Sequence, residues 1–297
     1  MIRQLVISIL LFSCLINTTA SKAPIPNPNC LTKCGGVSIP FPFGIREGCY
    51  VDKWFEVVCE NSSRRPILKS INLEVIRIDL YDGTLDVLFP ITFWNCSGGK
   101  TPQENRSLEG SPFAFSEDKN KFIAVGCEGH ATIILERDHI VAGCSSVCDS
   151  NVSVDTRCNG VNCCMTSIPS KLQVFNARFN ITSSSDQNSE TDCRYAFLGK
   201  ETWFSQSVTN LSALLEMTDV PVVLNWGLNA SKHEDVGKSV QSFSRKSGKR
   251  KSTRTGYCNT SFSSLFPESG QLACYCNGGF EGNPYLPGGC DGKAPLP

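Results

Sequence analysis

The cysteines of this chain offer its most informative chemistry, because pairs of them can form disulfide cross-links. Four of them, Cys30, Cys34, Cys49 and Cys59, fall within thirty residues, between glycines, prolines and aromatic residues. So short and cysteine-dense a segment depends on cross-links for much of its stability. Disulfides persist outside the reducing cytosol, so this spacing predicts a secreted protein. Zinc binding by the thiols is a weaker alternative, since an oxidising compartment favours disulfides.

Beyond the N-terminal apolar run, the cysteines sort by position into three groups with even counts, so each group could close on itself. The groups are Cys30, Cys34, Cys49, Cys59, Cys96 and Cys127; then Cys144, Cys148, Cys158, Cys163, Cys164 and Cys193; then Cys258, Cys274, Cys276 and Cys290. Six cysteines allow 15 pairings, which leaves the connectivity open. Cys163 and Cys164 should reach different partners, because a ring between neighbours is strained.

Residues that could support catalysis are sparse. The chain has three histidines, His130, His139 and His233, and it lacks the nucleophile-elbow, zinc-protease and phosphate-loop motifs. A glycosidase could use any pair of carboxylates, so a secreted hydrolase remains an open alternative. We expect a binding protein with no catalytic residue, no cofactor and no metal site.

The N-terminus is typical of a secretory signal peptide over residues 1–20. Arg3 precedes an apolar run from Leu5 to Ile16, and the small residues that end at Ala20 suit signal peptidase. The run of about 12 residues is shorter than the roughly 20 that a membrane span needs. Cleavage after Ala20 would leave 16 of the 17 cysteines, an even number that suits complete pairing.

Glycosylation sequons agree with secretion. Asn-x-Ser/Thr sequences begin at Asn61, Asn95, Asn105, Asn151, Asn180, Asn210, Asn229 and Asn259. Chance would give roughly three such sequons, so eight is an excess. Glycans must project into solvent, so these positions should lie in exposed loops or at strand edges. Asn95 is the least favourable of them, because Cys96 lies inside its sequon.

The charge balance argues against a nucleic-acid partner. Lys plus Arg number 28 and Asp plus Glu number 28, so the chain has no overall basic field. No second apolar run approaches the length of a membrane span, so a plasma-membrane location would require a longer form with a transmembrane helix.

Alternating apolar residues predict a mostly β, disulfide-rich fold of antiparallel modules. Ile76, Ile78 and Leu80 alternate with polar neighbours, Asp82-Gly83 supplies a hairpin turn, and Leu85, Val87 and Phe89 resume the pattern. Further short apolar runs cover 122–125, 131–135 and 139–142.

The rest of the chain predicts one short helix and one linker. Thr209 to Met217 reads as the helix, with Ser207 as its cap and Leu211, Leu214 and Leu215 on one face. Residues 229–256 are polar and carry a basic run from Arg245 to Arg254, which predicts a flexible linker. A solvated linker is the leading interpretation of that run, and an electrostatic contact with an anionic polymer is the alternative.

Several motifs resemble the extracellular region of plant wall-associated receptor kinases. Cys34-Gly35, Pro42 to Ile45, Gly48-Cys49 and Cys59 are similar to the signature of that family's galacturonan-binding module. The family's cysteine-rich C-terminal-type module is matched by Gly160 to Cys164, Ile168-Pro169 and Pro221 to Trp226. Cys274-x-Cys276 with Gly289-Cys290 resembles the second half of an EGF-like module, without the EGF calcium motif. Kinase signatures are missing from the chain.

The resemblance implies five segments. They are a signal peptide at 1–20, a galacturonan-binding-like β domain at 28–143, the cysteine-rich module at 144–228, the basic polar linker at 229–256 and a partial EGF-like module at 257–291. The EGF-like module is called partial because Cys258 is the only cysteine close enough before Cys274 to belong to its first half.

A galacturonan carries one carboxylate per sugar, so its recognition needs spaced cations and aromatic faces for stacking. The resemblance therefore implies contacts from Lys33, Arg46, Lys53, Arg64, Arg65, Lys69 and, further on, Arg77, with Tyr50 and Trp54 as stacking surfaces. Residues 30–100 hold eight basic and eight acidic side chains, so any electropositive patch has to arise by folding. A single cation is more often a solvated charge, and Trp54 is more often a core residue.

These expectations combine into a secreted protein of the apoplast and cell wall that binds acidic, de-esterified pectin. The alternative is a non-catalytic interaction or decoy ectodomain that has lost glycan binding, with full-length receptor kinases or other ectodomains as its partners. A secreted glycan hydrolase is less favoured.

Overall fold

The computed structural model describes residues 26–60, 64–94, 96, 106–126, 129–135, 138–147, 157–181, 193–209, 211–246, 255–263 and 265–293. The expected signal peptide, Cys127, Cys148 and most of the basic run after Lys246 lie outside these ranges. So do the sequons at Asn61, Asn95, Asn105, Asn151 and Asn210.

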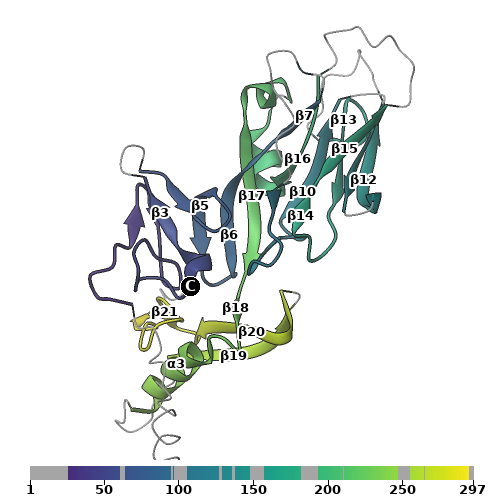
Figure 1. Cartoon of the computed structure of the whole chain (residues 1–297). Helices are drawn as coiled ribbons and strands as arrows, with labels where there is room; N and C mark the ends of the chain where they lie inside the picture. Colours follow the sequence, from purple (N-terminus) through teal and green to yellow (C-terminus); the bar gives the residue numbers. More distant parts are fainter. Residues whose placement is uncertain are drawn as a thin grey trace, which may run out of the picture.

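Antiparallel sheets dominate the chain, as predicted, and the largest has six strands (Figure 1). Its order is β3 (Val57–Cys59), β4 (Pro66–Leu68), β5 (Leu73–Asp79), β6 (Thr84–Pro90), β17 (Asp219–Trp226) and β9 (Phe113–Phe115). Leu85, Val87 and Phe89 alternate along β6 and are buried, because side chains of period two face the core. Since β17 pairs with β6, the sheet joins strands from both sides of the expected boundary at residue 143.

A second layer of strands packs beside this sheet (Figure 1). A four-stranded sheet runs in the order β13 (Cys163–Ser167), β10 (Asn120–Val125), β16 (Arg194–Lys200) and β7 (Thr92–Trp94). A three-stranded sheet has the order β12 (Ile140–Ser146), β11 (Gly129–Ile134) and β15 (Ala177–Ile181). Three two-stranded pairs complete the strands outside the C-terminal sheet: β1 (Lys33–Cys34) with β2 (Val37–Ser38), β8 (Arg106–Ser107) with β14 (Val174–Phe175), and β21 (Phe280–Glu281) with β22 (Gly292–Lys293).

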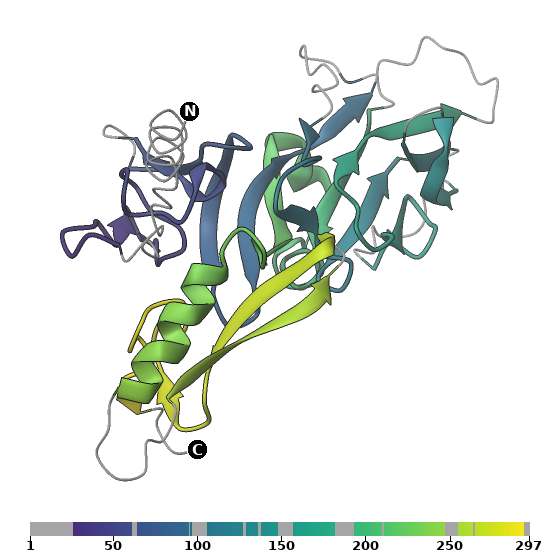
Figure 2. The same ribbon diagram turned by 60° about the horizontal axis from the view of Figure 1, so that its bottom comes forward.

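The C-terminal unit is a long hairpin covered by a helix. β18 (Leu228–Asn229), β20 (Phe266–Cys276) and β19 (Gly256–Ser263) form a sheet, and α3 (Glu234–Lys246) lies along it (Figure 2). Val236 and Val240 are buried and Leu272 of β20 is buried with them, so one face of α3 packs against the hairpin. Much of the segment expected to be a flexible linker is therefore helical.

Trp226 connects the three parts of the molecule. Its ring lies 5.2 Å from Phe43 and 6.0 Å from Phe55 of the N-terminal module, and 5.5 Å from Tyr285 of the C-terminal segment. The indole nitrogen donates to the Thr84 carbonyl of β6 at 3.2 Å. This cluster holds the N-terminal module and the C-terminal hairpin against the end of β17.

Seven disulfides join described cysteines. The pairs are Cys30–Cys49, Cys34–Cys59, Cys96–Cys193, Cys144–Cys164, Cys158–Cys163, Cys258–Cys274 and Cys276–Cys290. Cys163 and Cys164 reach different partners, as predicted. The expectation that each group closes on itself is wrong, because Cys96 of the first group pairs with Cys193 of the second. The pairing of β7 with β16 brings these two residues together.

Two local predictions also need correction. In β5 the fully buried residues are Leu73 and Val75, while Ile76 is 39% exposed, because a bulge between Val75 and Arg77 shifts the register. In place of one helix over 209–217, α2 (Glu201–Ser207) ends at the expected cap, Ser207, and a 3-10 helix (η3, Leu211–Glu216) follows. The expected apolar face survives, since Leu211 and Leu214 are buried.

Candidate functional site

The predicted binding residues separate into two groups at opposite ends of the β3–β4 hairpin. Lys53, Trp54 and Lys69 lie at one end, where Val57 pairs with Leu68. Arg64 and Arg65 lie at the other end, where Cys59 pairs with Pro66. The hairpin places the two ends about 10 Å apart, at roughly 3.3 Å per residue. One carboxylate could not be held by both groups at once.

The first group is positioned by a short 3-10 helix, η1 (Lys53–Phe55). Asp52 caps this helix by accepting from the backbone N–H of Trp54 at 2.8 Å. Gly44 lies against the same turn, and its N–H donates to the Phe55 carbonyl at 3.1 Å. A side chain on Gly44 would lie 2.3 Å from the Cys49 carbonyl oxygen, which explains why the Pro-Phe-Gly turn requires glycine.

A hollow of about 340 Å³ opens beside Trp54. Asp52 and Trp54 line it from the N-terminal module, Ser111 and Gln173 from the central sheets, and Lys232 and His233 from the segment before α3. Its volume falls within the range of small-molecule sites. Trp54 is half-buried, so it is neither a fully buried core residue nor a fully exposed surface residue.

Asp52 organises the charges of this hollow. Its Oδ2 lies 3.0 Å from Lys232 Nζ and 3.1 Å from His233 Nε2. Burial opposes ionisation of the carboxyl group, but the bonds from His233, Lys232 and the Trp54 N–H outweigh burial and lower the pKa of Asp52 to about 2. The carboxylate is therefore ionised at the pH of any compartment and keeps Lys232 at the mouth of the hollow.

Asp52 should consequently support folding at acid pH. Its folded-state pKa of about 2 lies below the ordinary value of 3.8, so its contribution is present above pH 3.8 and is lost as pH falls through 2. Solvent reaches the group, so we expect Asp52→Asn to cost about 1 kcal/mol at neutral pH. Urea unfolding from pH 6 to 2 measures this, with Asp138→Asn as an exposed control. Equal acid sensitivity of Asp52→Asn and the unmutated protein would refute it.

The other candidate cations of this part of the module differ in whether a carboxylate pairs with them. Lys69 donates to Glu56 at 2.8 Å and is held by that carboxylate. Burial and the nearby carboxylates of Glu56 and Glu47 raise the pKa of Tyr50, so its phenol stays neutral and can stack or hydrogen-bond. Among the described residues, Arg46 and Lys53 have no carboxylate within ion-pair distance, and both are exposed.

The second group consists of Lys33, Arg64 and Arg65. The Arg64 carbonyl lies 3.5 Å from Cys34 Sγ, so Arg64 adjoins the β1 strand that carries Lys33. Arg65 is paired with Glu60 at 3.3 Å and Glu74 at 3.2 Å. None of the three hollows of about 440, 340 and 260 Å³ is lined by this group. Arg77, the last candidate cation, pairs with Asp79 and lies on β5.

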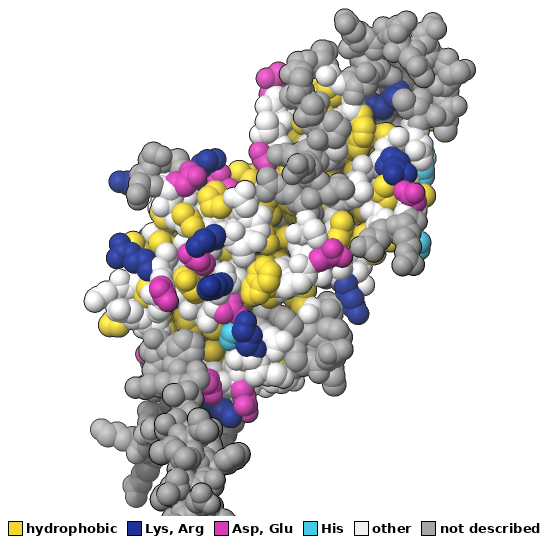
Figure 3. Space-filling model, viewed as in Figure 1, with side chains coloured by type: hydrophobic (Ala, Val, Ile, Leu, Met, Phe, Trp, Pro, Cys, Tyr) yellow, Lys and Arg dark blue, Asp and Glu magenta, His cyan; other side chains and the backbone are white. Residues whose placement is uncertain are grey.

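On the face drawn in Figure 3, the charges of the N-terminal module do not form one basic area. In Figure 3 its Lys and Arg side chains alternate with Asp and Glu across the visible face. Sequence reasoning missed Lys232, His233 and Asp52 as site residues. Lys232 follows Asp52 by 180 residues, and no local pattern signals that they meet.

Three of the predicted glycosylation sites fall on described residues. Asn180 of β15 and Asn259 of β19 are exposed, which suits a glycan acceptor. Asn229 of β18 is half-buried, lines the hollow beside Trp54, and accepts from the Lys232 N–H at 3.0 Å. Glycosylation of these positions stays a prediction.

The fold is that of a disulfide-bonded, mostly β protein, and its surface carries a hollow lined by Trp54 and by charged and polar side chains. Residues 30–88 match the family described as Wall-associated receptor kinase galacturonan-binding, and residues 155–235 match Wall-associated kinase. The chain therefore belongs to the wall-associated receptor kinase family and corresponds to the ectodomain of these receptors.

Relatives from Arabidopsis thaliana agree with this assignment. Wall-associated receptor kinase-like 4 is 35% identical over 91% of this chain, and Wall-associated receptor kinase-like 10 is 31% identical over 88% of it. The chain spans 38% of the length of each relative. No solved structure matches the chain. In the described part, no helix is long and apolar enough to cross a membrane.

Proposed function

We propose that this ectodomain binds acidic, de-esterified pectin outside the cell, without catalysis, through the hollow beside Trp54. The match of residues 30–88 to a galacturonan-binding family carries the ligand class. The hollow supports the site, because it combines the Trp54 ring with a lysine and a histidine in one space.

A galacturonate unit fits the chemistry of these side chains. Its carboxylate would pair with Lys232 or Lys53, whose ammonium groups are both exposed. The apolar face of its ring would stack on Trp54, and its hydroxyls would bond to the amide of Gln173 and the hydroxyl of Ser111. Cations elsewhere on the module would meet other carboxylates of the polymer and add affinity by multivalency.

Charge pairing sets the expected behaviour in solution. Affinity for polygalacturonate should fall at least ten-fold between 50 and 500 mM salt, since screening weakens exposed ion pairs. Methyl-esterified pectin should bind at least ten-fold more weakly, because esterification removes the carboxylates. Biolayer interferometry with immobilised polymers measures both effects.

Calcium chelation distinguishes binding that needs calcium-bridged ligand from binding through the protein's own cations. We expect calcium to act by bridging carboxylates of the ligand, because the described residues contain no group of three or more His, Cys, Asp or Glu that could hold a metal ion. Equal binding to esterified and de-esterified polymer would refute the charge-based mechanism. A folded protein that binds neither polymer would instead favour the alternative of an ectodomain whose partners are proteins.

A further inference from the structure

A larger cleft lies on the other side of Leu265, a residue that also lines the hollow beside Trp54. It has a volume of about 440 Å³ and opens between the β5–β6 turn, the end of β17 and the C-terminal hairpin. Its walls include Tyr81 and Thr84 from the turn, Asn225 from β17, and Gln271 and Tyr275 from β20. None of the predicted galacturonan contacts lines it.

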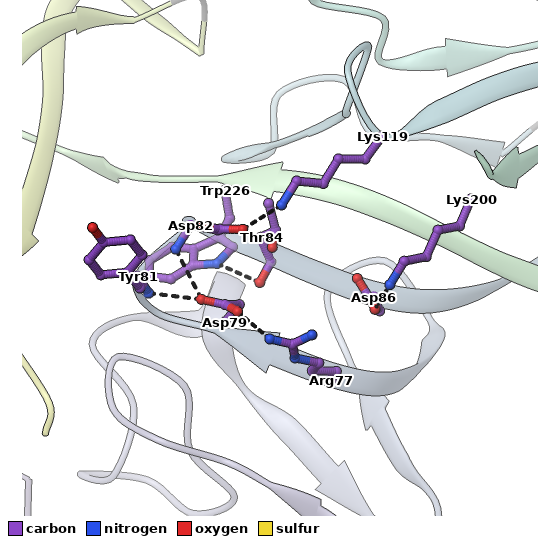
Figure 4. A network of polar contacts seen from close by, with 9 residues as sticks. All are labelled: Arg77, Asp79, Tyr81, Asp82, Thr84, Asp86, Lys119, Lys200 and Trp226. Atoms are coloured by element: carbon purple, nitrogen blue, oxygen red, sulfur yellow. Dashed lines mark hydrogen bonds and ion pairs between the residues drawn. The ribbon is translucent and has the colours of Figure 1, made fainter. Parts of the chain in front are cut away.

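The aromatic residues of this cleft include one that has no packing role. Tyr81 is 77% exposed, and in Figure 4 it projects from the turn on the side away from Lys200. Asp79 fixes this turn by accepting from the N–H groups of Tyr81 and Asp82, both at 3.0 Å. Trp226 and Tyr285 are buried and close the cleft from the core side. Tyr81 therefore presents an exposed aromatic ring from a hydrogen-bonded turn at the edge of the cleft.

Two ion pairs lie along the cleft and the hollow next to it. Lys119 lies 2.6 Å from Asp82, and in Figure 4 this pair and the Lys200–Asp86 pair, also 2.6 Å, stand along one line of the sheet. A second hollow of about 260 Å³ shares the Asp82–Lys119 pair, so the cleft continues past it. Such pairs present donors and acceptors together while their net charge is zero.

The balance of charge disfavours a polyanion here. The two adjoining hollows are lined by the acids Asp79, Asp82, Asp86, Glu117, Asp118 and Glu201 and by the bases Arg77, Lys119, Lys171 and Lys200. Six acids against four bases would repel a polygalacturonate chain. A peptide would need apolar anchor pockets, and the exposed lining consists mostly of hydroxyl, amide and charged groups.

We infer that this cleft is a second glycan site that takes an uncharged saccharide. The sugar ring stacks on Tyr81, and its hydroxyls bond to Thr84, Asn225 and the Asp82–Lys119 pair. The inference goes beyond pectin binding, because it concerns a different surface and a ligand without carboxylates. A wall polymer with neutral and acidic segments could then engage both sites.

Titration calorimetry with neutral oligosaccharides tests this inference, using cellohexaose, xylohexaose, β-1,4-galactohexaose and a xyloglucan heptasaccharide as probes. We expect at least one to bind, with affinity independent of salt from 50 to 500 mM. Tyr81→Ala should weaken this binding about ten-fold and Tyr81→Phe less than three-fold. Both variants should bind polygalacturonate as the unmutated protein does, so failure at this cleft is distinguishable from failure of pectin binding.

A matched charge variant distinguishes a saccharide from a basic peptide. Glu117→Gln keeps the shape and the hydrogen-bonding capacity of the side chain, so saccharide binding should change less than two-fold. Binding of an octa-arginine probe that depends on both Tyr81 and Glu117 would overturn the inference in favour of a cationic peptide. No binding of any neutral probe by the folded protein, or binding unchanged in Tyr81→Ala, would also overturn it.

Discussion

Neutralising Lys53 and Lys232 together should weaken polygalacturonate binding about thirty-fold. Lys232 lines the hollow beside Trp54 and the exposed Lys53 precedes Trp54 in η1, and each charge-assisted bond to a carboxylate is worth about 1 kcal/mol at an exposed site. Lys53→Gln/Lys232→Gln removes these bonds without adding repulsion. Asp52 keeps its bonds from His233 and the Trp54 N–H, so the fold should persist.

The second cation group supplies the matched control. Lys33→Gln/Arg64→Gln removes the same amount of charge from the protein, at the far end of the β3–β4 hairpin from Lys53. We expect its affinity to change less than three-fold. The same loss in both double variants would mean that the overall field of the module, and not the hollow beside Trp54, holds the polymer.

Replacing Trp226 by alanine should cost about 3 to 5 kcal/mol of stability. The indole is 1% exposed, contacts Phe43, Phe55 and Tyr285, and donates to the Thr84 carbonyl. The substitution leaves a cavity at a place where all three parts of the molecule meet. Thermal unfolding of the oxidised protein measures the loss.

Trp54→Ala is the companion variant to Trp226→Ala. Trp54 is half-buried at a hollow, so its loss should cost at most about 1 kcal/mol of stability but weaken polygalacturonate binding about ten-fold. An equal loss of stability in the two variants would show that Trp54 is a core residue after all.

Short-range features of this fold could be predicted from the sequence. The β5–β6 hairpin follows from alternating apolar residues around Asp82-Gly83, and the different partners of Cys163 and Cys164 follow from strain. The bulge in β5 was not predictable. Leu73 and Val75 alternate in one phase and Ile76 and Ile78 in the other, and the sequence does not mark the shift between Val75 and Arg77. Nor was α3, since over residues 234–241 its buried apolar side chains are two valines, Val236 and Val240, in a polar stretch.

Long-range features of the fold could not be predicted from the sequence for a different reason. The Cys96–Cys193 bridge depends on β7 meeting β16, a pairing between strands about 100 residues apart that neither strand signals alone. The hollow beside Trp54 likewise needs Asp52 to meet Lys232 and His233. The sequence predicted Lys53 as a partner for the ligand's carboxylates and Trp54 as a stacking surface. Only the packing of the C-terminal unit adds Lys232 and His233 to this hollow.

The most direct measurement is amide hydrogen exchange of the secreted protein with and without a saturating decagalacturonate. If the polymer occupies the hollow beside Trp54, exchange should slow together in residues 52–55 and 229–233, which come from distant parts of the chain. Residues 80–84 of the second cleft should be unaffected. Protection confined to residues 33–38 and 64–68, or no protection at saturation, would contradict the account.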